Sequence, residues 1–340
     1  MSSRKIATIK EVAARAGVSA MTVSRVTHNP SLVAQKTREH VQTAIDELNY
    51  IPDIAAGRLS SQRSKTIAMV LPSLHFEGHA RTVDALSKAL RLRGFHLLIA
   101  DNFYSPTEEM DLLKTILGRR PAAIVLINSA HSLAGRKLLT DAGIPVIETW
   151  DFPVRPMDSV VGFSHAEVGS ALTAHLVAQG YRRIAFIGGP RDADPRGDER
   201  RIGFEATMKA GGLESTRQIV IETDHLSIAA GKRGIEQLLE THPDTDAAIC
   251  LTDRVAMGAL MECRRRDIGV PDELAITGHG DFDFGEHLIP PLTTTRIDAA
   301  AIGERAAELV FARLDGKRLR KGRRLHNVGF EVIARDSSLR

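Results

Sequence analysis

Residues 8–27 read TIKEVAARAGVSAMTVSRVT, a stretch that predicts two short helices joined by a tight turn. Thr8 stands where a helix N-cap belongs, and Glu11 follows three residues later, which is the pattern of a capping box. Gly17 is placed to end the first helix, and Ser19 to cap a second one over Ala20–Val26. The apolar residues of the first helix recur at helical spacing: Ile9, Val12, Ala13 and Ala16.

The second helix is expected to turn Val23 and Val26 inward, and the small side chain of Ala13 lets the two helices cross closely. Helix, short glycine-containing turn and helix form the helix-turn-helix unit, whose second helix lies in the major groove of DNA. A third helix is predicted from about Ala34 to Asn49, with Pro52 as its stop. Its inward positions complete a small core: Val41, Ala44, Ile45 and Leu48.

The composition is that of an ordinary water-soluble protein, with 43% apolar and 26% charged residues in 340, a length that suggests two or three domains. No stretch reaches the ~18 consecutive apolar residues that a membrane span needs. The N-terminus lacks the apolar block of a secretory signal. Cys250 and Cys263 stand too far apart for a Cys-x-x-Cys motif, so no disulfide framework is expected. We therefore expect a cytoplasmic protein.

Positive charge is concentrated at the N-terminus. Residues 1–65 contain ten Lys or Arg against five Asp or Glu, a net charge of +5, whereas the other 275 residues sum to −2. A small basic module of this kind is where a phosphate backbone would be held.

Several ordered runs near the N-terminus occur together: TIKEVAARAGVSAMTVSRV, then Thr37-Arg38, Ala44-Ile45, Glu47-Leu48-Asn49-Tyr50 and Pro52. These runs resemble the headpiece of the lactose-repressor (LacI-type) family of transcriptional regulators, and the match continues at lower density along the chain. The resemblance implies three parts: a helix-turn-helix headpiece over 1–52, a hinge helix and linker over 53–65, and an effector-binding and dimerisation core over 66–340.

The same resemblance implies which headpiece residues contact DNA. Carried over by position, Ala20, Met21 and Arg25 face base edges, and Arg25 has the geometry for a bidentate contact to guanine. Phosphate contacts, which position the protein without reading sequence, are expected from Thr22, Ser24, Thr37 and Arg38. We also assign to this surface the motif residues Thr8, Ser19 and Tyr50.

The hinge departs from the family pattern. The alternative is a disordered linker, which fits the polar residues 60–65 best. In the family, the matching segment forms a short helix only on DNA, where a leucine wedges into the minor groove, and Leu59 occupies that position. Gly57 stands where an arginine is usual, and a glycine weakens such a helix by about 1 kcal/mol relative to alanine.

Beyond Thr66, short apolar runs alternate with amphipathic stretches, which predicts parallel, doubly wound sheets. The predicted strands are 67–71, 97–100, 122–127, 146–147, 184–187, 247–251 and 275–277, and the predicted helices are 80–93, 107–118, 165–179, 198–210, 228–240, 253–265 and 298–314. The family core is a pair of α/β lobes that resemble periplasmic sugar-binding proteins. We place lobe one at 66–163 plus 280–295 and lobe two at 164–279 plus 296–330.

Ligands of such sheets bind beyond the carboxyl ends of the strands. Arg200, in the pattern Arg-x-x-Gly-Phe with Gly203 and Phe204, matches the family arginine that binds the effector. Trp150 at a strand end is suited to stack on a sugar face, or else belongs to the interface core. The other candidate effector residues at strand ends are Pro72, His75, Phe76, His79, Asn128, Glu148, Thr252, Asp253, His279 and Asp281.

Two features favour an anionic ligand. Many sugar-binding members carry an aspartate after the Gly-aromatic pair of the late strand, whereas Gly278-His279 is followed here by Gly280. The segments Met21–Arg25, Pro145–Glu148 and Val161–Phe163, with the His279-Gly280 loop, resemble gluconate-type repressors. The expected effector is therefore a sugar acid such as gluconate, 2-ketogluconate or a phosphorylated form; a neutral sugar or a purine-type corepressor is the alternative.

Enzymatic motifs are not found. The sequence has no Gly-x-x-x-x-Gly-Lys-Ser/Thr run, and Asp283 stands where a dinucleotide fingerprint starting at Gly278 would need its third glycine. No Gly-x-Ser-x-Gly elbow or metal-spaced His/Cys group occurs either. We expect no enzyme activity and no cofactor. A single helix-turn-helix grips too little DNA, and residues 335–340 hold no leucine heptad, so a homodimer on a pseudo-palindromic operator is expected.

Overall fold

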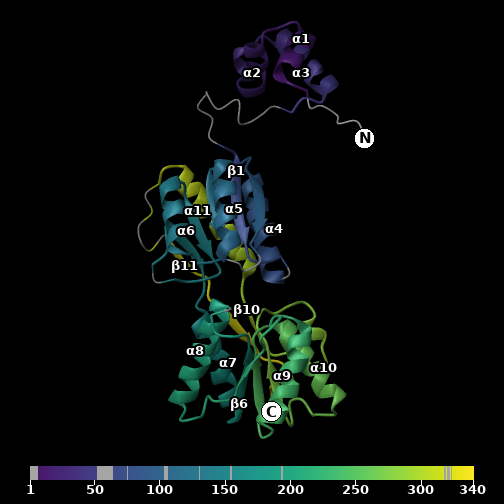
Figure 1. The fold of residues 1–340 in the computed structure, drawn as a ribbon, viewed down its shortest axis with the longest axis vertical. Helices are drawn as coiled ribbons and strands as arrows, with labels where there is room; N and C mark the ends of the chain where they lie inside the picture. The colour runs from purple at the N-terminus through teal and green to yellow at the C-terminus, as the bar shows by residue number, and fades with distance from the viewer. Residues whose placement is uncertain are drawn as a thin grey trace. The chain divides into compact units, whose positions relative to one another are not determined.

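The computed structural model divides the chain into two units, residues 1–63 and 64–340 (Figure 1). It describes residues 7–51, 64–74, 76–102, 106–129, 131–153, 155–192, 194–317, 319, 322 and 324–340. Among the predicted site residues, Leu59 and His75 lie outside this described part, as does Gly57.

The N-terminal unit contains three α-helices, and the predicted caps are confirmed. They are α1 (Ile9–Ala16), α2 (Ala20–His28) and α3 (Gln35–Leu48), with the short 3-10 helix η1 (Pro30–Leu32) before α3. Thr8 accepts a hydrogen bond from the Glu11 backbone N–H (3.4 Å), and the Glu11 carboxylate accepts one from the Thr8 N–H (2.6 Å). Ser19 caps α2 by accepting from the Thr22 N–H (3.1 Å), and Gly17 ends α1 at a φ of 65°.

The three helices enclose a small apolar core of Val12, Ala13, Val23, Val26, Val41 and Ala44. The end of α3 differs from the prediction. Asn49, in the left-handed conformation at a φ of 47°, ends the helix through backbone bonds from its own N–H, so Pro52 is not needed as the stop. Asparagine is one of the few residues that adopt this conformation readily.

Lobe one of the C-terminal unit is built on a six-stranded parallel sheet in the order β11-β5-β4-β3-β1-β2. Its strands are β1 (Thr66–Leu71), β2 (His96–Asp101), β3 (Ala123–Leu126), β4 (Val146–Thr149), β5 (Ser159–Gly162) and β11 (Leu325–Asn327). Its helices are α4 (Glu77–Arg91), α5 (Pro106–Gly118), α6 (Leu133–Ala142) and α11 (Ala299–Leu314).

Side-chain alternation along the strands sorts these helices into two layers. Ile67, Met69 and Leu71 of β1 share one apolar cluster with residues of α4 and α11. Ala68 and Val70 share the other cluster with residues of α5 and α6. Both faces of the sheet are therefore covered, as a parallel sheet requires.

Lobe two repeats this design around the sheet β7-β6-β8-β9. Its strands are β6 (Ile184–Gly188), β7 (Gln218–Val220), β8 (Ala247–Cys250) and β9 (Ala275–Thr277), with an antiparallel pair of β10 (Thr294–Arg296) and β12 (Glu331–Ile333). Its helices are α7 (His165–Ala178), α8 (Pro195–Ala210), α9 (Ile228–Thr241) and α10 (Asp253–Arg265), and the 3-10 helix η2 (Gly285–His287) follows β9. No helix among the described residues is long and apolar enough to cross a membrane.

The predicted assignment of the late segments to the lobes was wrong. Residues 280–295 belong to lobe two, where Thr293 bridges Thr277 beside β9. The later elements α11 (Ala299–Leu314) and β11 (Leu325–Asn327) belong to lobe one, where α11 packs on α4 and β11 pairs with β5. These late strands are only three residues long, so their own pattern carries no sign of which sheet they join.

Helices α7 and α8 cross at very short range because glycines face backbone at the crossing. A side-chain Cβ on Gly169 of α7 would overlap the Arg200 carbonyl, and one on Gly203 of α8 would overlap the Ala166 carbonyl. The two glycines thereby bring the first turn of α7 beside the middle of α8.

We predict that Gly203→Ala lowers the free energy of unfolding by about 1–3 kcal/mol, because the helix backbones must separate to admit the methyl group. Gly118→Ala at the end of α5 is the matched control, since its Cβ would meet no atom within 4 Å. Urea unfolding of both variants checks this. Equal stability of the two alanine variants would contradict the close crossing.

Candidate functional site

The carboxyl ends of both parallel sheets face one cavity of about 240 Å³. In lobe one, the cavity lining follows β1, β4 and β5, and in lobe two it follows β6, β7, β8 and β9. The lining residues are Ser73, Phe76, His79, Trp150, His165, Asp194, Arg196, Arg200, Asp224, Leu226, Ser227, Thr252, Arg254, His279 and Phe282.

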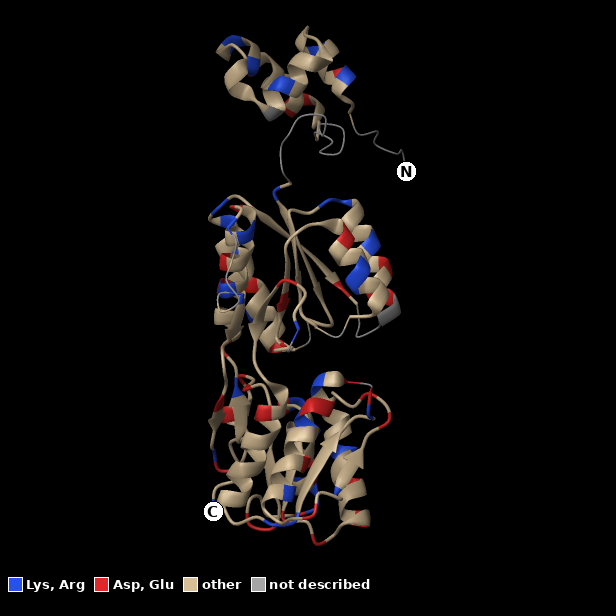
Figure 2. Cartoon of the chain, turned by 90° about the vertical axis from the view of Figure 1, so that its left-hand side faces the viewer, with Lys and Arg blue, Asp and Glu red and all other residues tan. Residues whose placement is uncertain are grey.

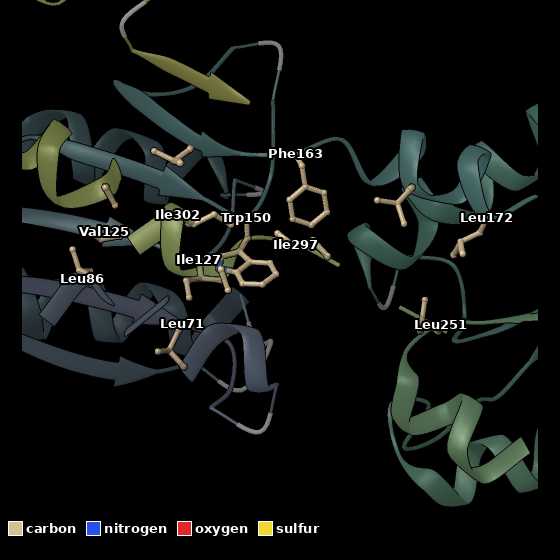
Figure 3. Packing of buried hydrophobic residues seen from close by; sticks show 14 of the residues in the cluster. Leu71, Leu86, Val125, Ile127, Trp150, Phe163, Leu172, Leu251, Ile297 and Ile302 are labelled. Atoms are coloured by element: carbon tan, nitrogen blue, oxygen red, sulfur yellow. The ribbon is translucent and has the colours of Figure 1, made fainter. Parts of the chain in front are cut away.

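Aromatic side chains form one wall of this cavity. Trp150 is almost fully buried, and its ring lies edge-on to Phe76, with 5.5 Å between ring centroids. Figure 3 shows Trp150 near Phe163, and their centroids are 5.9 Å apart. The Trp150 indole N–H donates to Thr82 Oγ1 (3.1 Å), which donates to the Ala299 carbonyl (2.8 Å). Trp150 is therefore both a core residue and a cavity residue.

Arg196, near the start of α8, connects the two lobes across the cavity. Its Nε donates to Asp151 Oδ1 (2.5 Å), and its Nη2 donates to the Ile127 carbonyl (3.1 Å). Asp151 also accepts from the Ser129 backbone N–H (2.7 Å). Burial alone would raise the pKa of Asp151, but Arg196 and the hydrogen bond to His165 outweigh it and hold that pKa well below its usual range.

Arg200 lies one turn further along α8 and is almost fully buried. Its Nη1 is 2.8 Å from His165 Nδ1, and its Nη2 is 3.8 Å from Asp194 Oδ2. His165 Nε2 is 3.1 Å from the Trp150 carbonyl. A carbonyl only accepts, so Nε2 carries the proton and Nδ1 accepts from Arg200. Arg200 is thus hydrogen-bonded to a neutral ring, whereas Arg196 is paired with a carboxylate.

The histidines of the cavity are neutral at physiological pH. Burial, with the nearby Arg196, lowers the pKa of His79 to about 3. Burial also lowers the pKa of His165 to about 4, with Arg200 adding to it, and the same causes hold the pKa of His279 well below its usual value. Neutral imidazoles donate and accept hydrogen bonds without adding charge.

Arg254 is a further cation in the lining, on the first turn of α10. It makes no hydrogen bond and no ion pair with any described residue, and its Nε is buried. Thr252, which caps the same helix by accepting from the Val255 N–H (3.4 Å), lines the cavity beside it. The acidic lining residues are Asp194 and the exposed Asp224.

Six predicted effector residues line the cavity: Phe76, His79, Trp150, Arg200, Thr252 and His279. Pro72 and Asn128 do not. Neither does Glu148, which is fully buried, accepts from the Met157 N–H (2.7 Å) and lies 3.7 Å from His131 Nε2. Burial raises the pKa of Glu148.

Two predicted carboxylates have structural partners instead of a place in the lining. Asp253 accepts from Thr294 Oγ1 (2.6 Å) and from the Phe282 N–H (2.9 Å). Asp281 accepts from Arg296 Nε (2.5 Å) and Arg335 Nη2 (2.8 Å). These bonds tie the start of α10 and the loop after β9 to β10 and the C-terminal segment.

The sequence analysis missed Arg196, His165 and Arg254. A signal existed for Arg196, because it stands four residues before Arg200 and so on the same helix face. His165 had none, since its role depends on the close crossing of α7 and α8. Among the described residues, no group of three or more His, Cys, Asp or Glu side chains is arranged to hold a metal ion.

The N-terminal unit presents a second candidate surface on α2. Met21 is 64% exposed and shares a face with the exposed Arg25, opposite the buried Val23 and Val26. Ala20, Thr22 and Ser24 are half-buried. The Thr22 hydroxyl lies 2.9 Å from the Ser19 hydroxyl, so both side chains take part in the cap of α2.

The start of α3 lies open by comparison. Ala34 occupies its N-cap without a side-chain hydrogen bond, and no acidic residue stands in its first turn. Thr37 and Arg38 are half-buried there. Backbone N–H groups at such a helix start attract phosphate. Tyr50 packs instead against the apolar core of the unit.

Comparisons with known proteins agree on one family. The family model described as "Bacterial regulatory proteins, lacI family" matches residues 8–53, and the "Periplasmic binding protein-like domain" matches 173–338. The HTH-type transcriptional regulator GntR of Pseudomonas aeruginosa is 34% identical over 331 residues, covering 97% of this chain and 95% of that protein. GntR of Escherichia coli is 32% identical, covering 92% and 94%. A LacI family regulator structure from Silicibacter pomeroyi matches 98% of this chain and all of its own, at 29% identity and a TM-score of 0.90.

We predict that stability falls as the pH drops from about 6.5 to about 4, in part through His165. Burial lowers the folded-state pKa of His165 from 6.5 to about 4, so the unfolded chain takes up a proton that the folded chain refuses. The contribution of His165 to the free energy of unfolding is on the order of 3 kcal/mol. It is fully present above pH 6.5 and is lost as the pH falls toward 4. Urea unfolding at several pH values should show a shallower loss in His165→Gln.

The surface variant His287→Gln controls for removal of a histidine as such, because His287 is exposed and outside the cavity. If His165→Gln lost stability with pH as steeply as the unmodified chain, the buried neutral role of His165 would be refuted.

Proposed function

Because the chain belongs to the LacI family of bacterial regulatory proteins and is a DNA-binding transcriptional regulator, we propose that it represses genes of sugar-acid catabolism. A small anionic ligand bound between the two lobes controls the affinity of the protein for its operator DNA. The protein acts in the cytoplasm as a homodimer on a pseudo-palindromic operator, as members of the family do. The cavity binds this ligand without carrying out a reaction on it.

DNA recognition is assigned to α2. Arg25 and Met21 project from its exposed face, so they are the side chains free to reach base edges in the major groove. Arg25 reads guanine through a bidentate contact, and Met21 and Ala20 supply apolar contacts, for instance to thymine methyl groups. Thr22, Ser24, Thr37 and Arg38 position the headpiece on phosphates, aided by the uncapped start of α3.

The ligand class rests on two arginines of the cavity lining, Arg200 and Arg254. Arg200 is hydrogen-bonded to a neutral histidine, with Asp194 at 3.8 Å, and Arg254 has no ion pair with a described residue. The half-buried guanidinium of Arg254, whose buried Nε has no hydrogen-bond partner, costs free energy that an anionic ligand would recover. A guanidinium also matches the two oxygens of a carboxylate or phosphate.

The rest of the lining suits a polyhydroxylated carbon chain. The faces of Phe76, Trp150 and Phe282 offer apolar contact to C–H groups. Ser73, Ser227 and Thr252, with the neutral histidines, offer hydrogen-bond donors and acceptors to hydroxyls. A gluconate, a 2-ketogluconate or a phosphorylated form contains both parts.

Arg196 couples ligand binding in the cavity to DNA binding by the headpiece. Its bonds to Asp151 and the Ile127 carbonyl join lobe two to lobe one beside the ligand site. An anion bound to Arg200, one turn away, changes the strength of these Arg196 bonds. The angle between the two lobes changes with them. The angle sets the spacing of the paired hinge segments, with a coupling free energy of about 1–3 kcal/mol.

We predict different losses for two headpiece variants. Arg25→Ala removes a base contact, so its preference for operator over scrambled DNA should fall by a factor equivalent to about 1–3 kcal/mol. Arg38→Ala removes a phosphate contact, so it should weaken binding to both DNAs alike. Gel-shift titrations with an operator selected from a random duplex pool measure both. An unchanged preference in Arg25→Ala would refute the assignment.

We predict that Arg200→Gln and Arg254→Gln each weaken sugar-acid binding by about 10- to 100-fold, the loss expected for a charged hydrogen bond. Calorimetry with gluconate, 2-ketogluconate, 6-phosphogluconate and glucose makes the measurement. Operator binding without ligand should persist in both variants. Arg233→Gln is the control, because this exposed residue bonds only the Thr223 carbonyl, outside the cavity.

Binding of glucose with no binding of any of the three sugar acids would overturn the ligand class and leave the repressor assignment standing. Sugar-acid binding that survives both arginine variants would refute their role.

A further inference from the structure

The edge of lobe one opposite the cavity is strongly basic. This hinge-side edge consists of the connections that precede β1, β2 and β3 and follow α11. Figure 2 shows Lys and Arg gathered along it. Its exposed basic residues among those described are Lys65, Arg91, Arg93, Arg119, Arg120 and Lys317, and Arg324 there is half-buried and lies 3.8 Å from Asp158. The core sums to a net charge of −2, so this edge is a local departure from the balance of the rest.

Most of this positive charge is not neutralised by neighbouring carboxylates. Arg93 pairs with Asp315 (3.2 Å). Lys65, Arg91, Arg120 and Lys317 form no ion pair with any residue that the structure describes.

Helix polarity does not explain the excess. Helices of a parallel α/β lobe end at the edge where its strands begin, and basic residues favour helix C-termini. Lobe two has the same topology, and four basic residues at its corresponding edge are paired with carboxylates. Arg217 lies 2.9 Å from Asp244, Arg183 lies 3.7 Å from Asp246, and Arg265 and Arg266 both contact Glu262. Lys209 and Arg264, in the last turns of α8 and α10, also form no ion pair with a described residue, so the edge of lobe one is distinguished by its place next to the linker and not by unpaired charge alone.

The position of the edge in the chain indicates its partner. Lys65 immediately precedes β1. The described headpiece ends at Ile51 and the C-terminal unit begins at Ser64, so only the twelve residues 52–63 separate them. Twelve residues span at most about 43 Å when fully extended. Whenever the headpiece holds DNA, the edge is therefore confined near the same duplex, and exposed lysines and arginines bind phosphates by releasing counterions.

We propose that the hinge-side edge of lobe one is a second, sequence-independent DNA contact that binds the phosphate backbone alongside the headpiece. The proposal rests on the DNA binding of the family and on no particular ligand or operator. It assigns the unpaired cations of the core a role that base recognition through α2 does not require.

The test compares two triple variants of the full chain. Lys65→Gln, Arg91→Gln and Lys317→Gln together remove three charges from the edge. Lys209→Gln, Lys232→Gln and Arg264→Gln together remove three exposed charges from lobe two and serve as the matched control. Fluorescence anisotropy follows binding to a random-sequence duplex of about 40 base pairs, roughly four helical turns, across a range of salt concentrations.

The slope of log affinity against log salt should become shallower by about 3 per chain in the edge variant and stay unchanged in the control. Between about 50 and 150 mM salt, the unmodified chain should lose about 20-fold more affinity than the edge variant. Equal slopes in all three proteins, or equal losses in the two variants, would overturn the proposal.

The random duplex separates this proposal from operator recognition. Failure of the Arg25 prediction would leave the salt slopes untouched, whereas failure here would leave sequence discrimination intact. Thermal unfolding of each variant establishes that it is folded before the slopes are compared.

Discussion

A guanidinium group removed from water needs hydrogen-bond acceptors within the protein. Much of the core provides such acceptors for two arginines of α8, Arg196 and Arg200. Arg196 obtains Asp151 and a carbonyl from lobe one. Arg200 obtains His165, which must stay neutral and must be close, and the glycine crossing of α7 and α8 provides that closeness. The positions of the helices, the tautomer of a histidine and the connection between the lobes all follow from two buried positive charges.

The headpiece could be predicted almost to the residue because its determinants are local. The capping residues contact only neighbours within a few positions: Thr8, Glu11, Gly17 and Ser19. Their spacing in the sequence is therefore enough to predict their hydrogen bonds. The strands and helices of the core were found for the same reason where a long apolar run or a clear period marked them. Asn49 was overlooked as a helix end because Pro52 gave the more familiar signal.

What sequence could not supply was pairing between distant segments. The strands β10, β11 and β12 have three residues each, and only their partners determine their lobe. Among strand-end residues, orientation decided the outcome: Thr252 faces the cavity, whereas the next residue, Asp253, turns to Thr294 and Phe282. The Glu148 carboxylate lies away from the cavity, 3.7 Å from His131 Nε2 in the interior of lobe one. Adjacent residues on a helix start point in different directions, and their types alone do not reveal which one meets the ligand.

The threading of the chain through both lobes has a consequence for biosynthesis. Lobe one is incomplete without β11, and lobe two is incomplete without β12 and Ser337, whose hydroxyl bonds the Ile276 carbonyl (2.6 Å). The sheet of lobe one cannot close before β11 has been synthesised, and the strand pair of β10 and β12 in lobe two cannot form before β12 has, while the headpiece is free to fold from the outset. A nascent chain thus presents a complete helix-turn-helix unit before the two lobes that enclose the cavity are finished.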